Sequence, residues 1–424
     1  MKDTTPSDVP QLTTPDVNTD ETDAGADALA EQTETLTIMG TADKFSIAGK
    51  GAIGGRIDWT EEQERQQADK NSVIYSECQS FEELNLSETL LKGVYAMGFK
   101  KPSNIQAKAF PIILKENKDL LAQSQSGTGK TAAFSLGMLA KIDLTQQHPQ
   151  ALCVSPAREL AKQTFDVCSE IGRFTDIGLH LAVSGQKRDR NLVIKEQIVI
   201  GTPGSVIDLL KSKKINGDHI KMLVFDEADQ MLDVSSMQAD SIRIRKQLNP
   251  NHQTLMFSAT FTPRVLEFAS KVCPEAVQIT IEVKKQALDA ISQFVIECPN
   301  QYSKYNVVTD IYDSVQIGQL IIFVNKKQTA QELCDKLTQA GHSVCSLFGG
   351  NAQDKYSMEA ATRDRELDDF KSGRKKVLVT TNVLSRGIDI DQVNMVINYD
   401  LPIRFSEQGK PLGVDTEVYL HRIG

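Results

Sequence analysis

A lysine and a threonine close a glycine-rich stretch, residues 124–131, that reads Ser-Gln-Ser-Gly-Thr-Gly-Lys-Thr. The apolar run 119–123 precedes this stretch and the helix-like run 132–140 follows it. A strand, tight turn and helix in that order point backbone N–H groups and the positive end of the helix dipole at one place, which makes a phosphate site. Lys130 would contact the β- and γ-phosphates, and the Thr131 hydroxyl would be a Mg²⁺ ligand.

The loop departs from the usual GxxxxGK[ST] pattern, because Ser124 stands where the first glycine is expected. Taken alone, it leaves a chance glycine-rich turn as the alternative. We expect nucleotide contacts along the whole loop, from Ser124, Gln125, Ser126, Gly127, Thr128, Gly129, Lys130 and Thr131.

A second apolar run ends in three carboxylates. Met-Leu-Val-Phe at 222–225 is followed by Asp226, Glu227 and Asp229. Acidic clusters at strand ends are usually solvated turns, but after a phosphate loop they can serve a metal, since Mg²⁺ takes oxygen ligands and keeps several waters. Asp226 would hold a metal-bound water, and Glu227 would orient or deprotonate the water that attacks the γ-phosphate. Lys130, Asp226 and Glu227 are therefore candidate catalytic residues of an NTPase.

Three literal motifs in sequential order connect the chain to a known family. They are Asp226-Glu-Ala-Asp229, Ser258-Ala-Thr260 and Gly98-Phe-Lys-Lys-Pro-Ser-Asn-Ile-Gln106. From about residue 71 to its end, the chain resembles a DEAD-box RNA helicase. The resemblance implies an α/β fold of two RecA-like parallel-sheet domains in tandem, ATP and Mg²⁺ as cofactors, and RNA-stimulated ATP hydrolysis.

Gln106, the last residue of the motif that begins at Gly98, indicates which base is bound. The Gln106 amide can accept and donate together, which matches the amino donor and the N7 acceptor of adenine and favours ATP over GTP. Phe99 and Lys101 would pack around the base. Phe81, seventeen residues before Gly98, stands at the offset where the family keeps an upstream aromatic. A core phenylalanine and a helix-capping glutamine are the alternatives for these residues taken singly.

The remaining motifs of the resemblance imply roles in coupling and RNA binding. Ser258 and Thr260 would couple hydrolysis to strand separation, and Asp389 would accept from the ATP ribose hydroxyls across the domain cleft. The residues expected to serve RNA are Pro156, Arg158, Gly185, Thr202, Gly204, Arg363, Thr381 and Arg386. Ala157 and Ser205 replace the family's usual Thr and Arg, so we expect weaker RNA affinity in the first domain, with sequence-independent backbone binding retained.

Length and charge distribution fit two domains behind a polar tail. The chain has 424 residues, which is more than a single domain with one hydrophobic core usually contains. Residues 1–70 contain 15 acidic and 6 basic side chains, which accounts for the formal net charge of −9, and the remainder holds 41 of each. We expect 1–70 to be a disordered acidic tail. A short helix near residues 60–69 would be either a solvated spacer or an inhibitor lodged between the domains.

The domain boundaries follow from the motifs and from a loosened pattern between them. We expect a first RecA-like domain at 71–283, a linker at 284–290 and a second RecA-like domain at 291–424. Strands of the second domain are expected at 293–298, 319–325, 343–348, 377–381 and 395–399, alternating with helices as a parallel sheet requires.

Cysteine usage and hydropathy indicate a compartment. The seven cysteines show no CxxC spacing and are odd in number, which favours a reducing compartment over disulfides or zinc. The amino terminus has no apolar signal region and no segment reaches membrane-spanning length. We expect a soluble, intracellular monomer.

One branch of the family resembles the chain most closely, the helicases that remodel mRNA–protein complexes at the cytoplasmic face of the nuclear pore. The stretches that resemble it are 71–76, 81–84, 91–99, 122–126, 196–201, 379–383 and the insertion 404–415. The branch implies mRNA export, a location in cytoplasm and nucleus, and single-stranded RNA in mRNA–protein complexes. It also implies a nucleoporin and a Gle-type activator with inositol hexakisphosphate as partners, largely through the second domain.

The sequence stops at His421-Arg-Ile-Gly424, inside the family's motif VI, whose later arginines stabilise γ-phosphate charge in the transition state. We therefore expect a truncated chain, nearly inactive alone in RNA-stimulated ATP hydrolysis. Two alternatives stay open. One is a hydrolysis-deficient RNA clamp or interaction protein, and the other is a DNA-acting helicase of the same superfamily.

Overall fold

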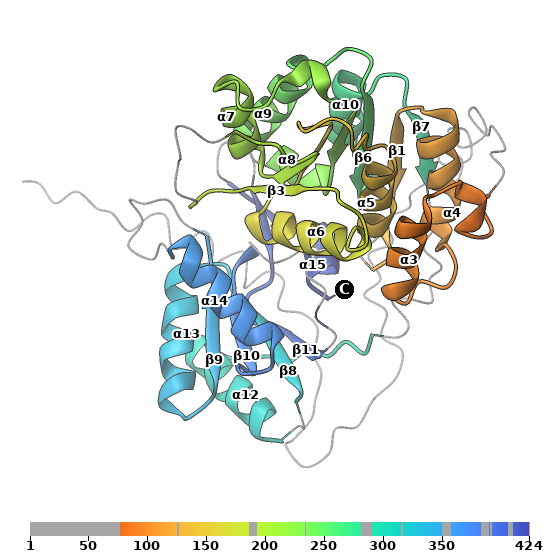
Figure 1. Cartoon of the computed structure of the whole chain (residues 1–424). Coiled ribbons are helices and arrows are strands. Elements are labelled where there is room, and N and C mark those ends of the chain that lie inside the picture. The colour runs from red at the N-terminus through yellow and green to blue at the C-terminus, as the bar shows by residue number, and fades with distance from the viewer. Residues whose placement is uncertain are drawn as a thin grey trace, which may run out of the picture.

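The computed structural model describes residues 77–124, 127–185, 193–233, 235–280, 291–314, 317–349, 358–382, 390, 392–405 and 410–423. The expected tail at 1–70, its short helix and the linker at 284–290 lie outside these ranges. Within them, no helix is both long and apolar enough to cross a membrane. Figure 1 shows two α/β units, the first coloured from orange to green and the second from cyan to blue.

A parallel sheet of seven strands forms the centre of the first unit, in the order β3-β4-β2-β5-β6-β1-β7. The strands are β1 (Leu120–Gln123), β2 (Ala151–Val154), β3 (Leu179–Ala182), β4 (Ile198–Gly201), β5 (Met222–Phe225), β6 (Gln253–Ser258) and β7 (Val277–Thr280). Strands β2, β4 and β5 are buried along their whole length. Continuous apolar runs of this kind are typical of a parallel sheet that is covered on both faces.

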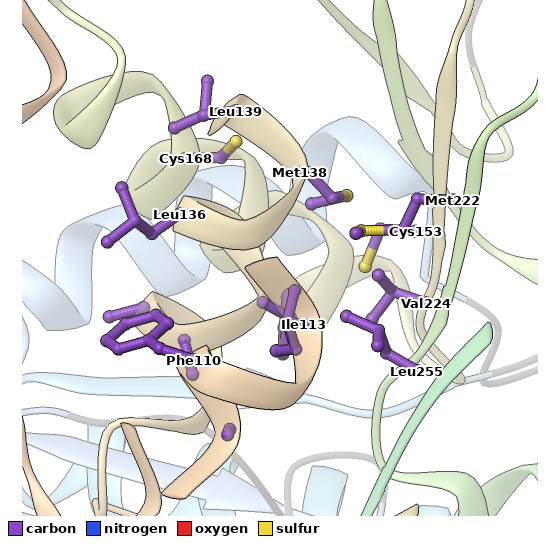
Figure 2. Close-up of a cluster of buried hydrophobic side chains, with 14 of the residues drawn as sticks. Phe110, Ile113, Leu136, Met138, Leu139, Cys153, Cys168, Met222, Val224 and Leu255 are labelled. Carbon is purple, nitrogen blue, oxygen red and sulfur yellow. The ribbon is translucent and has the colours of Figure 1, made fainter. Parts of the chain in front are cut away.

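Helices cover both faces of this sheet. They are η1 (Glu82–Leu84), α3 (Glu88–Ala96), α4 (Asn104–Phe110), η2 (Pro111–Glu116), α5 (Lys130–Ala140), α6 (Arg158–Ile171), α7 (Pro203–Lys211), η3 (Gly217–His219), α8 (Ala228–Asp233), α9 (Ser235–Lys246) and α10 (Pro263–Val272). On one face, Phe110, Ile113 and Leu136 belong to the same apolar cluster as Val224 and Leu255 of the strands (Figure 2). Helices α7 to α10 contribute to the second cluster, on the opposite face.

The second unit has a parallel sheet of four described strands in the order β11-β8-β10-β9. These are β8 (Gln319–Phe323), β9 (Val344–Leu347), β10 (Val377–Thr380) and β11 (Val393–Asn398), with α12 (Gln301–Ser314), α13 (Lys327–Gln339), α14 (Ala360–Lys371) and α15 (Thr416–Ile423). Val377 and Val379 pack with α12 and α13, whereas Leu378 packs with α14, because alternate residues of a strand face opposite sides. Two RecA-like parallel-sheet domains are therefore confirmed.

The insertion at 404–415 contains a small antiparallel ribbon of β12 (Ile403–Phe405) and β13 (Pro411–Val414). It connects the end of the sheet to α15. The ribbon contributes no strand to the parallel sheet.

One expected element is wrong: residues 293–298 do not form a strand. Phe294 and Val295 are 67% and 51% exposed. A strand exists only where its N–H and C=O groups pair with a neighbour, and among the described strands none pairs with this segment. Its apolar sequence predicted a buried strand, but in the described part of the domain these side chains are exposed.

Candidate nucleotide site and interdomain surface

The phosphate loop joins β1 to α5 and uses glycine at two left-handed positions, Gly127 at φ +74° and Gly129 at φ +94°. A Cβ at Gly129 would lie 2.7 Å from Gln106 Nε2, so no other residue fits there without displacing that amide. The Ser124 and Thr128 hydroxyls hydrogen-bond across the loop at 2.6 Å. Gln125 and Ser126 lie outside the described residues.

Lys130 begins α5 and faces the acidic end of β5. Its Nζ donates to Glu227 Oε1 at 3.0 Å, and both side chains are buried. Burial and the charge of Glu227 raise the pKa of Asp226 to about 7. Burial would lower the pKa of Lys130, but the charges of Glu227 and Asp226 outweigh it, so the pKa of Lys130 is raised. Lys130 is therefore the counter-ion of these carboxylates.

Glu227 also has an unusual backbone. It adopts φ +48°, a left-handed conformation that is uncommon for a residue with a side chain and that concentrates at functional sites. Its Oε2 atom is buried, and no group in the described part of the chain hydrogen-bonds to it. A buried carboxylate oxygen with an open position fits a group that is to orient a water, and oxygen donors at Asp226 and Thr131 are the type that Mg²⁺ prefers.

The Ser-Ala-Thr motif lies between the phosphate loop and the acidic cluster, because β6 pairs with β1 and places Ser258 opposite Gln123. Ser258 O accepts from Ser124 N at 3.0 Å. Thr260 Oγ1 donates to Asp229 Oδ2 at 3.4 Å, and Ser258 Oγ donates to Thr260 O at 2.8 Å. The expected coupling residues thus contact both halves of the NTPase machinery.

The Gln106 amide bridges α4 and the phosphate loop. Its Oε1 accepts from Ser103 N at 3.0 Å, and its Nε2 donates to Gly129 O at 3.1 Å. An amide oxygen has two acceptor positions and an amide nitrogen two protons. One acceptor and one donor therefore remain, which is the pair that adenine requires. The helix-capping role and the base-reading role are compatible.

Three aromatic or basic residues were expected near the base. Phe99 and Phe81 line, with Gln106, a small cavity of about 10 Å³. Phe81 is buried in the core and packs edge-on against Phe110. The Lys101 side chain is exposed.

The expected RNA residues of the first domain cluster at adjacent strand ends. Pro156 follows β2, Gly185 lies shortly after β3, and Thr202 and Gly204 follow β4 at the amino terminus of α7. Because β3, β4 and β2 are neighbours in the sheet, these residues share one edge. A Cβ at Gly204 would meet no described atom within 4 Å, so the described residues leave room for a ligand backbone at this helix end.

Two expected RNA residues, Arg158 and Arg363, form ion pairs between the domains. Arg158 Nη2 lies 2.7 Å from Asp364 Oδ2, and Arg363 Nη2 lies 2.5 Å from Glu159 Oε1. Arg158 also donates to Ser184 O.

A third pair, Lys162 with Asp368 at 3.4 Å, stands one helical turn further along both helices. We call these three pairs the α6–α14 ladder; α6 lies on the side of the first domain that faces the second (Figure 1). Members spaced by four residues share one helix face.

Sequence reasoning missed Glu159, Lys162, Asp364 and Asp368. Two positive charges spaced by four residues on α6 and two negative charges with the same spacing on α14 can be detected in the sequence. Nothing in the sequence, however, indicates that these two helices meet. In the second domain, Thr381 is buried directly after β10. Arg386 and Asp389 lie outside the described residues.

A glycine loop whose lysine contacts the glutamate of a strand-end Asp-Glu pair, on one of two tandem parallel-sheet domains, defines a two-domain P-loop nucleoside triphosphatase. Residues 103–268 match the DEAD/DEAH box helicase family and residues 303–424 match the helicase conserved C-terminal domain. The chain belongs to the DEAD-box family of ATP-dependent RNA helicases.

Known relatives agree. The ATP-dependent RNA helicase DBP5 of Kluyveromyces lactis is 47% identical over 359 residues, which cover 84% of this chain and 74% of the relative. The ATP-dependent RNA helicase DBP5 of Saccharomyces cerevisiae is 45% identical over 359 residues, which cover 84% of this chain and 72% of the relative. The solved structure of S. cerevisiae Dbp5 bound to RNA and ADP BeF3 matches with a TM-score of 0.74 and 45% identity, over 82% of this chain and 85% of that one. A variant of S. cerevisiae Dbp5 bound to Gle1 and IP6 matches with a TM-score of 0.67 and 44% identity, over the same shares.

Proposed function

We propose that this chain is an RNA-stimulated ATPase and RNA helicase that remodels mRNA–protein complexes during mRNA export. The observation that supports it best is the buried contact between Lys130 and Glu227, next to Asp226, together with the hydrogen bond from the Gln106 amide to Gly129, which adjoins Lys130. In this proposal Lys130 binds phosphate, Glu227 orients water and Gln106 reads adenine.

ATP binding would separate Lys130 from Glu227. The ammonium then contacts the β- and γ-phosphates, and the released Glu227 carboxylate orients the attacking water. Thr131 and, through water, Asp226 would hold Mg²⁺, which supplies positive charge against the charge that develops on the phosphates. The Thr260 hydroxyl, which contacts Asp229, transmits the state of this cluster to the strand end after β6.

Single-stranded RNA would lie along the open strand ends of the first domain and across to Thr381 in the second. Contacts there go to the RNA backbone, so sequence preference is slight. The α6–α14 ladder holds the two domains beside each other at this edge. Nucleotide and RNA bound on both sides of the boundary favour the closed arrangement, and hydrolysis with phosphate release reopens it.

The partners proposed for this chain follow from relatives whose structures contain them. S. cerevisiae Dbp5 variants have been solved with Gle1 and IP6 and with Nup159, Gle1, IP6 and ADP. We infer that this chain also binds a Gle-type activator with inositol hexakisphosphate and a nucleoporin. It would then act at the cytoplasmic face of the nuclear pore.

ATP hydrolysis in a single turnover, with protein in large excess so that even a slow rate is measured, tests the proposed function with and without single-stranded RNA. We expect RNA to accelerate phosphate release, and we expect Glu227→Gln to slow it by about 100-fold or more, the scale of losing a general base. Mg·ADP affinity should be retained in Glu227→Gln. A hydrolysis rate that is the same with and without RNA, or that is unchanged in Glu227→Gln, would overturn the proposal.

A further inference from the structure

A buried arginine in α15 connects the ends of three strands of the second domain. Arg422 is 3% exposed. Its Nη1 donates to Asn398 Oδ1 at 2.9 Å and to Asp400 O at 2.8 Å. Its Nη2 donates to Asn325 Oδ1 at 3.4 Å and to Asn382 Oδ1. All four acceptors are amide or backbone oxygens.

These acceptors share one edge of the sheet. Asn325 follows β8, Asn382 follows β10, and Asn398 and Asp400 stand at the end of β11. The carboxyl edge of a parallel sheet is where α/β proteins bind ligands. The guanidinium of Arg422 therefore fixes the relative positions of three chain segments at the ligand-binding edge.

The Arg422 side chain is buried although Asn325 and Asn382 are exposed, and the site depends on the shape of the guanidinium. The Arg422 guanidinium lies over the Phe323 ring, 4.9 Å from its centre. Burial lowers the pKa of Arg422 to about 10, although the charges of Asp400 and Asp415 act in the opposite direction. A planar fork of five donors can reach acceptors on three segments at once, whereas a lysine ammonium acts as a point charge.

One of the three segments contains an expected RNA residue. Thr381 lies between Thr380, whose hydroxyl donates to Leu347 O at 2.6 Å, and Asn382, which Arg422 holds. The backbone of Thr381 is thus fixed on both sides, by β9 and by α15. Removing either anchor would loosen the position of Thr381 relative to the sheet.

We propose that Arg422 is a positioning residue for RNA binding: it holds Asn382, and through it Thr381, in the place where the RNA backbone is bound. The inference rests on the proposed function and deepens it. Arg422 acts through the neighbouring residue and does not itself contact RNA or nucleotide.

Two asparagine variants separate positioning from general support of the fold. Asn382→Ala and Asn398→Ala each remove one amide acceptor from the same buried guanidinium, but only Asn382 adjoins Thr381. The test measures affinity for a labelled single-stranded RNA in saturating Mg·ADP·BeF3, with Mg·ADP calorimetry and thermal unfolding on each variant.

We expect Arg422→Lys and Asn382→Ala each to weaken RNA binding about tenfold, the scale of one hydrogen bond to a charged group. Asn398→Ala should change it by less than about twofold, and Mg·ADP affinity should stay unchanged throughout. In the double variant Arg422→Lys with Asn382→Ala, the RNA defect should not exceed that of the larger single change, because both act on one contact.

Two results would overturn the inference alone: wild-type RNA affinity in Asn382→Ala, or equal losses in Asn382→Ala and Asn398→Ala. The asparagine pair decides the matter even where Arg422→Lys does not fold. A wild-type chain that binds no RNA with Mg·ADP·BeF3 would overturn the proposed function and this inference together, so the two failures are distinguishable.

Discussion

Lys130 donates a hydrogen bond to Glu227 inside the first domain, with 3.0 Å between Nζ and Oε1 and side-chain exposures of 6% and 4%. The loop that is to bind phosphate thus holds the carboxylate that is to activate water. In the proposed mechanism a ligand phosphate would compete with Glu227 for the ammonium. The nucleotide would then release the carboxylate when it has a water to act on.

Breaking this buried pair should lower stability. Lys130→Met leaves Glu227 uncompensated, and Glu227→Gln leaves Lys130 without its counter-ion, so each should lower the free energy of unfolding by about 3 kcal/mol. The double variant should lose clearly less than the sum, because neither member of the Lys130–Glu227 pair is left buried without the other. Urea unfolding of the four proteins measures this, and losses that add to within about 0.5 kcal/mol would contradict the coupling.

Nucleotide binding should depend on pH through Asp226. The raised pKa of Asp226, about 7, means that this carboxyl is largely protonated at pH 6 and ionised at pH 8. Binding a hydrated cation favours the ionised form, so Mg·ADP affinity should rise by up to about tenfold from pH 6 to pH 8.

Calorimetry at pH 6.5 in two buffers of different ionisation enthalpy measures the accompanying proton. We expect release of a fraction of one proton in the wild type and none in Asp226→Asn. Equal Mg·ADP affinity at pH 6 and pH 8 would count against a shifted Asp226.

Charge exchange across the α6–α14 ladder should separate its two roles. Asp364→Arg places two guanidinium groups together and should weaken domain closure with Mg·ADP·BeF3 and RNA. Arg158→Asp combined with Asp364→Arg restores the ion pair but puts a carboxylate near the expected RNA path. Closure measured by energy transfer between one dye on each domain should recover in the exchanged variant.

RNA affinity in the exchanged variant should stay lowered, by about tenfold, since a phosphate contact is replaced by a like charge. The pair of Lys162 and Asp368 is the matched control. Its side chains are more exposed, so the same exchange there should change closure by less than about 1 kcal/mol. Full RNA affinity in the Arg158→Asp, Asp364→Arg protein would remove Arg158 from the RNA site.

Base selection should depend on Gln106. Gln106→Glu keeps an acceptor for the adenine amino group but loses the donors that reach N7 and Gly129 O. We expect Mg·ADP affinity to fall about 10- to 100-fold, with a smaller preference over Mg·GDP. Competition with a fluorescent ADP analogue gives both values; an unchanged ratio of ADP to GDP affinity would mean that another group reads the base.

The first domain was largely predictable because its chemistry is local in sequence. The phosphate loop, the Asp226-Glu227 strand end and Ser258 each follow an apolar run, and parallel pairing brings those ends to one edge. The double use of the Gln106 amide was not predictable, because it depends on how close Gly129 comes to α4.

The contacts between the domains could not be predicted as well from the sequence. Arg158 and Arg363 were singled out as RNA residues from motif position alone, and their ion-pair partners Asp364 and Glu159 become visible only when α6 and α14 are placed beside each other. The strand expected at 293–298 was wrong for a different reason. The composition of this segment indicates a strand, but a strand also requires a neighbouring strand to pair with, which composition cannot reveal.

RNA binding with and without nucleotide tests the central claim most directly. Fluorescence anisotropy of a labelled single-stranded RNA is recorded without nucleotide, with Mg·ADP·BeF3 and with Mg·GDP·BeF3, for the wild type and for Lys130→Ala. We predict that Mg·ADP·BeF3 tightens RNA binding by about tenfold or more in the wild type only, and that the guanine nucleotide has little effect. RNA affinity that is the same in all conditions, or an equal response in Lys130→Ala, would contradict the account.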